Sequence, residues 1–240
     1  MMAAMSTYVL VHGAWGGSYG WRKVRPLLIK AGHDVYTPSL TGQGERAHLA
    51  TPQVNLTTHI KDVHNAIWYE DLTDIILVGH SYGGMVVTGV ADQLPERIKH
   101  LVYLDAFLPE NGQSLYDLGG GGPRPAEGDW RVPMRAFQGA GVDPNDPVVQ
   151  WNAARRVDHP RATLEEKVKL SAPLESRPFT LTYIQALGRP EGQGGSFFDT
   201  CADRLRANPR WTVRTIDGGH GMNQTNPEGL AELLLELFPD

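Results

Sequence analysis

The stretch ILVGHSYGGMVV, residues 76–87, sets one serine among three glycines, between two aliphatic runs. Residues 79–83 fit the pattern G-x-S-x-G, which forms a sharp turn from a strand into a helix. The serine in such a turn has a strained backbone, and larger neighbours would collide, so glycines are needed. The turn exposes the hydroxyl beside a helix N-terminus, whose free N–H groups favour negative charge. An ordinary glycine-rich turn is the alternative, but the strand and helix patterns on either side favour Ser81 as a nucleophile.

The sequence around this turn alternates between strand-like and helix-like segments. Short apolar runs predict strands at 7–11, 34–38, 74–80 and 98–107. Helical spacing of apolar residues separates them, at 21–33, 57–70 and 83–96. In the second of these segments Ile60, Val63, Ile67 and Trp68 are expected on one helical face. Apolar strands separated by helices predict an α/β fold with a mostly parallel, doubly wound sheet that is covered on both faces.

The alternation stops at 109–178, which contains four consecutive glycines and most of the prolines. It resumes with strand-like PFTLTYIQ and WTVRTID and with the amphipathic helix PEGLAELLLELF. We therefore predict a core of residues 1–108 and 179–240, with a lid inserted at 109–178. No Lys-Ser/Thr pair follows the four glycines, so they indicate a lid hinge rather than a phosphate-binding loop.

Composition limits the classes of function. The chain has 240 residues, 41% of them hydrophobic, with a net charge of −5, which suits one large domain. The single Cys201 excludes an intramolecular disulfide. Because no cluster of histidines and cysteines lies near it, a zinc site with thiolate ligands is not expected. Without a block of like charge or 18 consecutive apolar residues, we expect no nucleic-acid or membrane partner. The apolar start ends at His12 and resembles a strand more than a signal peptide, so a cytoplasmic protein is expected. The oligomeric state stays open, with a homodimer as one alternative.

A second glycine pattern, TGQGERA at 41–47, has Asp62 about twenty residues further on, as in dinucleotide-binding turns. That motif belongs between the first strand and a helix, whereas this segment follows the second predicted strand and no helix begins directly after it. We therefore expect no organic cofactor and no metal.

A serine hydroxyl needs a general base, and the histidine comes last in the chain order of this motif. The histidines after Ser81 are His100, His159 and His220. His100 begins a predicted strand and His159 lies in the lid. His220 follows the last predicted strand, in a loop that can reach the sheet edge, and is the predicted base.

Two backbone N–H groups are expected to form an oxyanion hole. One belongs to Tyr82, the residue after the nucleophile. The other comes from the glycine-rich loop VHGAWGG after the first strand, where Ala14 is the predicted donor. A glycine-rich connection without chemistry is the alternative for this loop.

Together these residues resemble the α/β-hydrolase superfamily, in the branch of plant methylesterases, hydroxynitrile lyases, and bacterial esterases and carbamate hydrolases. The resemblance is strongest over 7–110 and weakest across the lid. The lyases carry a threonine after the histidine of the oxyanion loop and a lysine after the catalytic histidine. Here those positions hold Gly13 and Gly221, so the resemblance implies a hydrolase and leaves a hydroxynitrile lyase as an alternative.

The acid departs from the family pattern. Relatives usually place it after the strand that corresponds to LTYIQ, but there this chain has no aspartate and only Glu191. Asp105 ends the strand after the nucleophile's helix, at the catalytic edge of the sheet. A carboxylate among apolar residues needs a partner, and His220 would supply one. We predict Asp105 as the acid, with Glu191, Asp217 and Asp199 as alternatives; Asp105 could instead cap the lid's first turn.

The predicted reaction is acyl transfer through a Ser81 acyl-enzyme, without cofactor or metal. The expected substrate is a small aromatic or methyl carboxylic ester, and a methyl carbamate is the second choice. A ligand-binding receptor with little turnover and a cofactor-free dioxygenase are further alternatives. Four aromatic residues are expected to line an apolar substrate pocket: Trp15, Trp130, Phe137 and Trp151.

Overall fold

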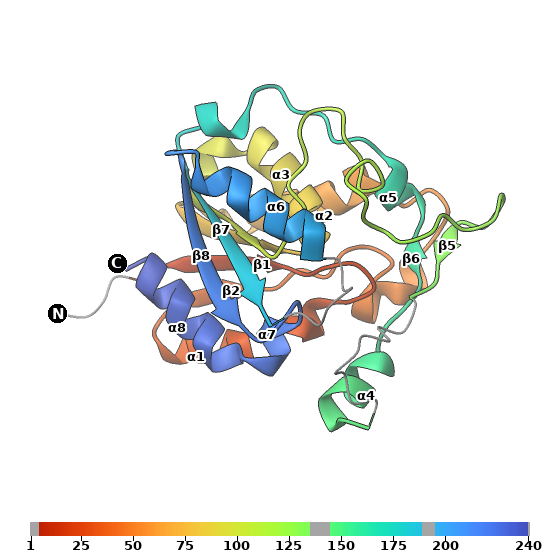
Figure 1. Cartoon of the computed structure of the whole chain (residues 1–240), viewed down its shortest axis with the longest axis horizontal. Helices are drawn as coiled ribbons and strands as arrows, with labels where there is room; N and C mark the ends of the chain where they lie inside the picture. Colours follow the sequence, from red (N-terminus) through yellow and green to blue (C-terminus); the bar gives the residue numbers. More distant parts are fainter. Residues whose placement is uncertain (1–4, 135–144, 189–194, 240) are drawn as a thin grey trace.

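A six-stranded sheet forms the centre of the protein (Figure 1). The computed structural model describes residues 5–134, 145–188 and 195–239. All neighbouring strands of this sheet are parallel, in the order β2-β1-β3-β4-β7-β8. The strands are β1 (Thr7–Val11), β2 (Asp34–Tyr36), β3 (Ile75–His80), β4 (Ile98–Leu104), β7 (Thr180–Leu187) and β8 (Trp211–Asp217). The predicted α/β fold with a doubly wound parallel sheet is confirmed.

Helices cover both faces of the sheet (Figure 1). The helices on one face are α1 (Val24–Lys30) and α8 (Pro227–Leu237). The opposite face carries α2 (Leu56–Tyr69), α3 (Gly83–Gln93) and α6 (Gly195–Arg206). Alternate residues of β1 enter the two cores: Tyr8 and Leu10 pack toward α1 and α8, and Val9 and Val11 toward α2 and α3. The two central strands β1 and β3 are covered on both faces, which explains why they are apolar almost throughout, whereas β2 and β8 at the sheet edges are partly exposed.

The predicted apolar face of α2 is correct except for its last member. Ile60, Val63 and Ile67 are buried, but Trp68 is 53% exposed. Successive helical residues are about 100° apart, so the position after Ile67 turns off the buried stripe. Trp68 instead lies against the Arg97 guanidinium, 5.4 Å from the ring centre.

Residues 109–178, predicted as a lid, contain only short elements among their described residues. They are β5 (Arg131–Val132), α4 (Pro147–Ala153), β6 (His159–Pro160), α5 (Ala162–Glu165) and the 3₁₀ turn η4 (Leu174–Ser176). β5 and β6 pair antiparallel, apart from the main sheet. Elsewhere the short helices are η1 (Ser18–Trp21), η2 (Gly44–Leu49), η3 (Pro95–Arg97) and α7 (Met222–Thr225). That the segment opens and closes as a lid stays a prediction. Among the described helices, none is long and apolar enough to cross a membrane.

Close packing explains the glycines around Ser81. A Cβ on Gly79 would lie 2.6 Å from Val87 Cγ2, and one on Gly83 would lie 2.7 Å from the Val11 carbonyl oxygen. A Cβ on Gly84 would be only 2.0 Å from the Phe107 carbonyl oxygen. The glycines therefore let α3 start directly against β1 and the segment after β4.

We expect Gly84→Ala to destabilise the protein by about 3 kcal/mol or more, because backbone cannot yield to the added methyl group. Urea unfolding would measure the change. Gly221→Ala is the matched control, since a Cβ there meets nothing within 4 Å. Equal stability of both variants and the wild type would contradict this account of the turn.

Candidate active site

Ser81 lies in the turn between β3 and α3, with a left-handed backbone (φ 55°). The backbone around it is held on both sides. Its N–H donates to the Leu104 carbonyl at 3.3 Å, and its carbonyl accepts from Gly84 N at 3.0 Å and Phe107 N at 3.1 Å. These bonds compensate for the strained φ and fix the direction of the side chain.

His220 follows β8 and lies beside the serine. Its Nε2 is 2.9 Å from Ser81 Oγ, and its Nδ1 is 2.7 Å from Asp105 Oδ2. His80 Nε2–H donates to the His220 carbonyl oxygen at 2.8 Å. The Phe198 ring stacks on the imidazole, with 5.2 Å between ring centres and 19° between planes. The histidine is thus held through both its ring and its backbone.

Asp105 directly follows β4 and is fully buried. Its backbone is also left-handed (φ 43°), and its N–H donates to the Ile184 carbonyl at 2.7 Å. Oδ1 accepts from Ala186 N at 3.1 Å, which leaves Oδ2 for the histidine. A carboxylate buried among apolar residues needs hydrogen-bond partners, and both oxygens of Asp105 have one.

The other candidate acids are placed differently. Asp199 accepts a hydrogen bond from Gln185 Nε2 at 2.6 Å. Asp217 is exposed at the end of β8. Glu191 lies outside the described residues. Among the candidates that the structure describes, Asp105 is the one hydrogen-bonded to His220.

The predicted oxyanion loop passes directly beside the nucleophile. A Cβ on Gly13 would lie 2.9 Å from Ser81 Cβ and 3.4 Å from its Oγ. Ala14 follows Gly13, and Trp15 is left-handed (φ 58°). Tyr82 precedes the first residue of α3, so its N–H belongs to the helix N-terminus. Both predicted donors therefore belong to segments next to Ser81, and their role stays a prediction.

The aromatic residues predicted to line a substrate pocket contact other parts of the protein, and their role in substrate binding stays a prediction. The Trp15 ring donates from Nε1 to the Val132 carbonyl at 2.8 Å. Trp130 lies against the Arg131 guanidinium. Trp151 of α4 packs against Arg22 and Arg155, 3.9 and 3.8 Å from its ring centre. No described contact brings Trp130 or Trp151 to the serine, and Phe137 lies outside the described residues.

Sequence reasoning missed the aromatic residues that do reach the site. Phe107 contacts Phe197 and Phe198, with ring centres 5.0 and 4.9 Å apart, and Phe198 stacks on His220. The sequence offers a local signal only for the first of these residues. Phe107 comes two residues after Asp105, and the Phe197–Phe198 pair lies in the first turn of a helix that begins beyond β7. These three phenylalanines are called the Phe cluster below.

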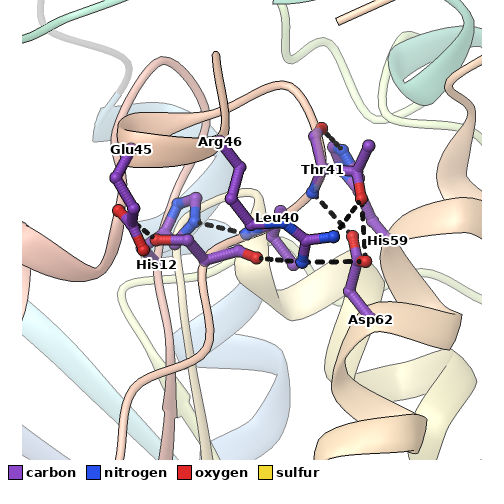
Figure 2. Close-up of polar contacts among 8 residues, drawn as sticks. His12, Leu40, Thr41, Glu45, Arg46, His59 and Asp62 are labelled. Carbon is purple, nitrogen blue, oxygen red and sulfur yellow. Dashed lines mark hydrogen bonds and ion pairs between the residues drawn. The ribbon is translucent and has the colours of Figure 1, made fainter. Parts of the chain in front are cut away.

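Behind the oxyanion loop, the buried His12 and His59 belong to a network of polar contacts (Figure 2). His12 accepts from Leu40 N at 3.1 Å through Nε2 and donates to the Gly13 carbonyl at 2.8 Å through Nδ1. His59 Nε2–H donates to the Thr41 carbonyl at 2.9 Å, and its Nδ1 accepts from the Tyr82 hydroxyl at 2.8 Å. Through these contacts the network holds both flanks of the nucleophile.

Asp62, noted above for its spacing from the glycines of the 41–47 segment, has partners within this network. It accepts from Thr41 N at 2.6 Å and from Arg46 Nη1 at 3.1 Å (Figure 2). It therefore holds the 41–47 segment rather than presenting a free carboxylate. Among the described residues, no group of three or more His, Cys, Asp or Glu side chains could hold a metal ion.

The buried histidines make stability depend on pH. Burial lowers the pKa of His12 and His59 to about 4 and that of His80 to about 3. The unfolded chain takes up protons below about pH 6.5, where the folded protein keeps these rings neutral, so stability falls as the pH falls. We expect the free energy of unfolding to drop by about 1 kcal/mol per histidine between pH 7 and 5.5, or about 3 kcal/mol for the three.

Urea unfolding at the two pH values measures this drop. His59→Gln should remove about 1 kcal/mol of the dependence, because its ring no longer titrates. Unchanged stability between pH 7 and 5.5 would show that these rings are not buried in their neutral form.

Comparison with known proteins identifies the family. A family model described as "Alpha/beta hydrolase family" matches residues 8–233. The chain belongs to the alpha/beta hydrolase family. This alpha/beta hydrolase is 40% identical to a "Carbendazim hydrolyzing esterase" of Nocardioides sp. (strain SG-4G), over 97% of its own length and all of the relative. It is also 34% identical to "Methylesterase 1" of Arabidopsis thaliana over 118 residues, 45% of this chain and 41% of the relative.

One solved structure resembles this chain over nearly its whole length. It is an extracellular alpha/beta-hydrolase from a Paenibacillus species, described as sharing structural and functional homology with tobacco salicylic acid binding protein 2. Its TM-score is 0.75 at 27% identity, covering 98% of this chain and all of the neighbour. The family and its esterase relatives make this alpha/beta hydrolase a hydrolase of small esters. Because that neighbour is extracellular, the cytoplasmic location expected above stays a prediction.

Proposed function

We propose that the protein is a serine hydrolase that cleaves small esters through an acyl-enzyme on Ser81. One observation carries this proposal: a continuous chain of hydrogen bonds runs from Ser81 Oγ to His220, at 2.9 Å, and from His220 to Asp105, at 2.7 Å. A hydroxyl, an imidazole and a buried carboxylate in this order form the arrangement that makes serine nucleophilic.

In the proposed mechanism His220 Nε2 takes the proton of Ser81 as its Oγ attacks the substrate carbonyl. Asp105 fixes the tautomer with the proton on Nδ1 and stabilises the imidazolium that forms. The N–H groups of Ala14 and Tyr82 hold the oxyanion. His220 then protonates the leaving alcohol, and afterwards it activates water to release the acyl group.

We propose a carboxylic ester of an aromatic or methyl type as the substrate class. The Phe cluster supports an apolar group beside the scissile bond, because Phe198 stacks on the imidazole that serves the leaving group. The methylesterase relatives support a small alcohol as the leaving group.

A methyl carbamate is the second candidate. It is favoured by the relative named for carbendazim hydrolysis, which is similar over nearly the whole chain. Carbendazim carries a methyl carbamate on an aromatic ring system, and its carbonyl can be attacked by the same serine. The same triad and oxyanion hole would serve both substrates.

Two residues weigh against lyase chemistry, although an "Alpha-hydroxynitrile lyase" of Arabidopsis thaliana is 37% identical over 109 residues. Gly13 stands where the lyases carry a threonine, and on the present backbone a Cβ there would approach Ser81 Cβ to 2.9 Å. Gly221 stands where they carry a lysine whose charge would assist a leaving cyanide. Both departures favour hydrolysis.

Incubation with p-nitrophenyl acetate and with a fluorophosphonate tests the proposal. We expect rapid labelling of Ser81, located by mass spectrometry, and sustained release of nitrophenol. Release of one equivalent that then stops would indicate a receptor-like protein. A panel of methyl esters and methyl carbamates of the same aromatic groups, read by mass spectrometry, would rank the two substrate classes.

A further inference from the structure

Two short strands of the predicted lid reach the oxyanion loop. β5 and β6 pair antiparallel, with Val132 directly opposite His159. This pair of strands is called the lid ribbon below. Both of these residues contact Trp15, the residue after the predicted oxyanion donor Ala14. The lid ribbon therefore touches the catalytic machinery at one defined place.

Trp15 is held by the lid ribbon at two points. Its backbone N–H donates to His159 Nδ1 at 3.3 Å, and its indole Nε1–H donates to the Val132 carbonyl at 2.8 Å. The left-handed backbone of Trp15 (φ 58°) is unfavourable for a bulky residue and needs such support. The conformation of the loop thus depends on contacts that the lid ribbon supplies.

His159 is enclosed by the segments that form the site. It is fully buried, and its ring centre lies 4.9 Å from that of Tyr82. The preceding residue, Asp158, accepts a hydrogen bond at its carbonyl from Gln43 Nε2 at 3.2 Å. This position leaves the ring little freedom to turn away from Trp15.

The hydrogen bonding of His159 suggests a role other than packing. Nδ1 accepts from Trp15, and burial lowers the pKa of His159 well below its ordinary value, so the ring is neutral with its proton on Nε2. Among the described residues this buried Nε2 has no hydrogen-bond partner. An unpaired buried N–H is unfavourable, and an apolar side chain of similar size would avoid it. The feature that an apolar residue could not supply is the acceptor at Nδ1.

We propose that His159 is a positioning residue for the oxyanion hole. His159 accepts the hydrogen bond of the Trp15 N–H and so fixes the oxyanion loop. In this conformation the Trp15 N–H is bound to the lid ribbon, and the Ala14 N–H faces Ser81. The lid ribbon would then supply part of the catalytic geometry as well as cover the site. This inference rests on the proposed function, because it assigns a support to the same oxyanion hole.

Three substitutions at His159 separate the acceptor from packing. An asparagine places its Oδ1 near the position of Nδ1 and can accept the same bond. A glutamine of similar size places its oxygen near Nε2 and cannot, and leucine has no acceptor at all. We expect His159→Leu and His159→Gln to lower kcat about 10- to 100-fold with little change in KM, since losing an oxyanion donor outright costs roughly 10²–10³-fold. The kcat of His159→Asn should stay within about fivefold of the wild-type kcat, because asparagine restores the hydrogen bond to the Trp15 N–H.

Affinity for a trifluoromethyl ketone provides the second readout, because its serine adduct carries an oxyanion in the same hole. It should weaken in His159→Leu by about the same factor as kcat/KM, whereas a merely structural role would not affect it selectively. Trp15→Phe, which removes the bond to Val132 and keeps a smaller aromatic ring, should give a smaller loss of kcat and tests the ribbon without substituting His159. Urea unfolding of each variant identifies any that fails to fold.

The outcomes distinguish this inference from the proposed function. Wild-type protein that neither turns over p-nitrophenyl acetate nor reacts with a fluorophosphonate would overturn the proposed function itself. An active wild type together with a folded His159→Leu of unchanged kcat would overturn the positioning role alone. Equal losses in the asparagine, glutamine and leucine variants would overturn it as well, because they would show that the volume of the ring matters and its acceptor does not.

Discussion

Ser81→Ala is expected to lower kcat on an activated ester by about 10⁶-fold, because the nucleophile and its base act as one unit. The residual rate should come from the oxyanion hole and from substrate binding. These still accelerate the reaction by roughly 10³–10⁴-fold over the uncatalysed rate in water. KM should change little, since the substituted hydroxyl contributes mainly to the transition state. Steady-state kinetics with p-nitrophenyl acetate would measure both quantities.

Ser176→Ala is the matched control for that experiment. Ser176 donates from its hydroxyl to the Pro173 carbonyl at 2.7 Å within η4 and should keep wild-type kcat. The variant at Ser81 should also lose fluorophosphonate labelling, and the control should retain it. If Ser81→Ala kept more than about a hundredth of the wild-type kcat, an acyl-enzyme on this serine could not be the main route.

Asp105→Asn is expected to lower kcat on the order of 10⁴-fold, the loss expected when the imidazole is left in the wrong tautomer. Asparagine is the informative substitution at this position. It is nearly isosteric, and it tolerates the left-handed backbone (φ 43°) that alanine would find strained. The folded structure should therefore persist while the carboxylate that accepts from His220 Nδ1 is lost. Initial rates and urea unfolding, measured together, separate the two effects.

Two variants identify the acid by contrast. Asp217→Asn changes an exposed carboxylate close to His220 in sequence and should leave kcat near the wild-type value. Glu191→Gln tests the position that relatives would suggest. A large loss for Glu191→Gln with near wild-type kcat for Asp105→Asn would reverse our assignment.

The parts of the site that sequence predicts best are those governed by local rules. The turn around Ser81 needs glycines at fixed positions, and the contacts of Gly79, Gly83 and Gly84 show why. The location of Asp105 follows from the sheet, since the carboxyl ends of parallel strands share one edge. His220 could be predicted because it follows the last strand and so reaches that same edge.

Contacts between distant segments could not be predicted in this way. Trp151 stays a prediction for the pocket, but its packing against Arg22, more than a hundred residues earlier in the chain, follows from no local pattern. The stacking of Phe198 on His220 depends on where α6 begins relative to β8, which no local pattern specifies. The bond between His159 and Trp15 joins residues 144 positions apart and follows only from the assembled fold.

The wide separation of the triad along the chain has a consequence during synthesis. Ser81 follows β3 and Asp105 follows β4 within a single β3–α3–β4 unit, whereas His220 comes 115 residues after Asp105. At about 5–20 residues per second, a ribosome needs on the order of 10 s to translate that interval. A nascent chain therefore carries the proposed nucleophile and acid for some seconds without the proposed base. With the proposed triad, hydrolytic activity should appear only after the segment that carries His220 has been made, so a chain that stops before this residue should be inactive toward esters.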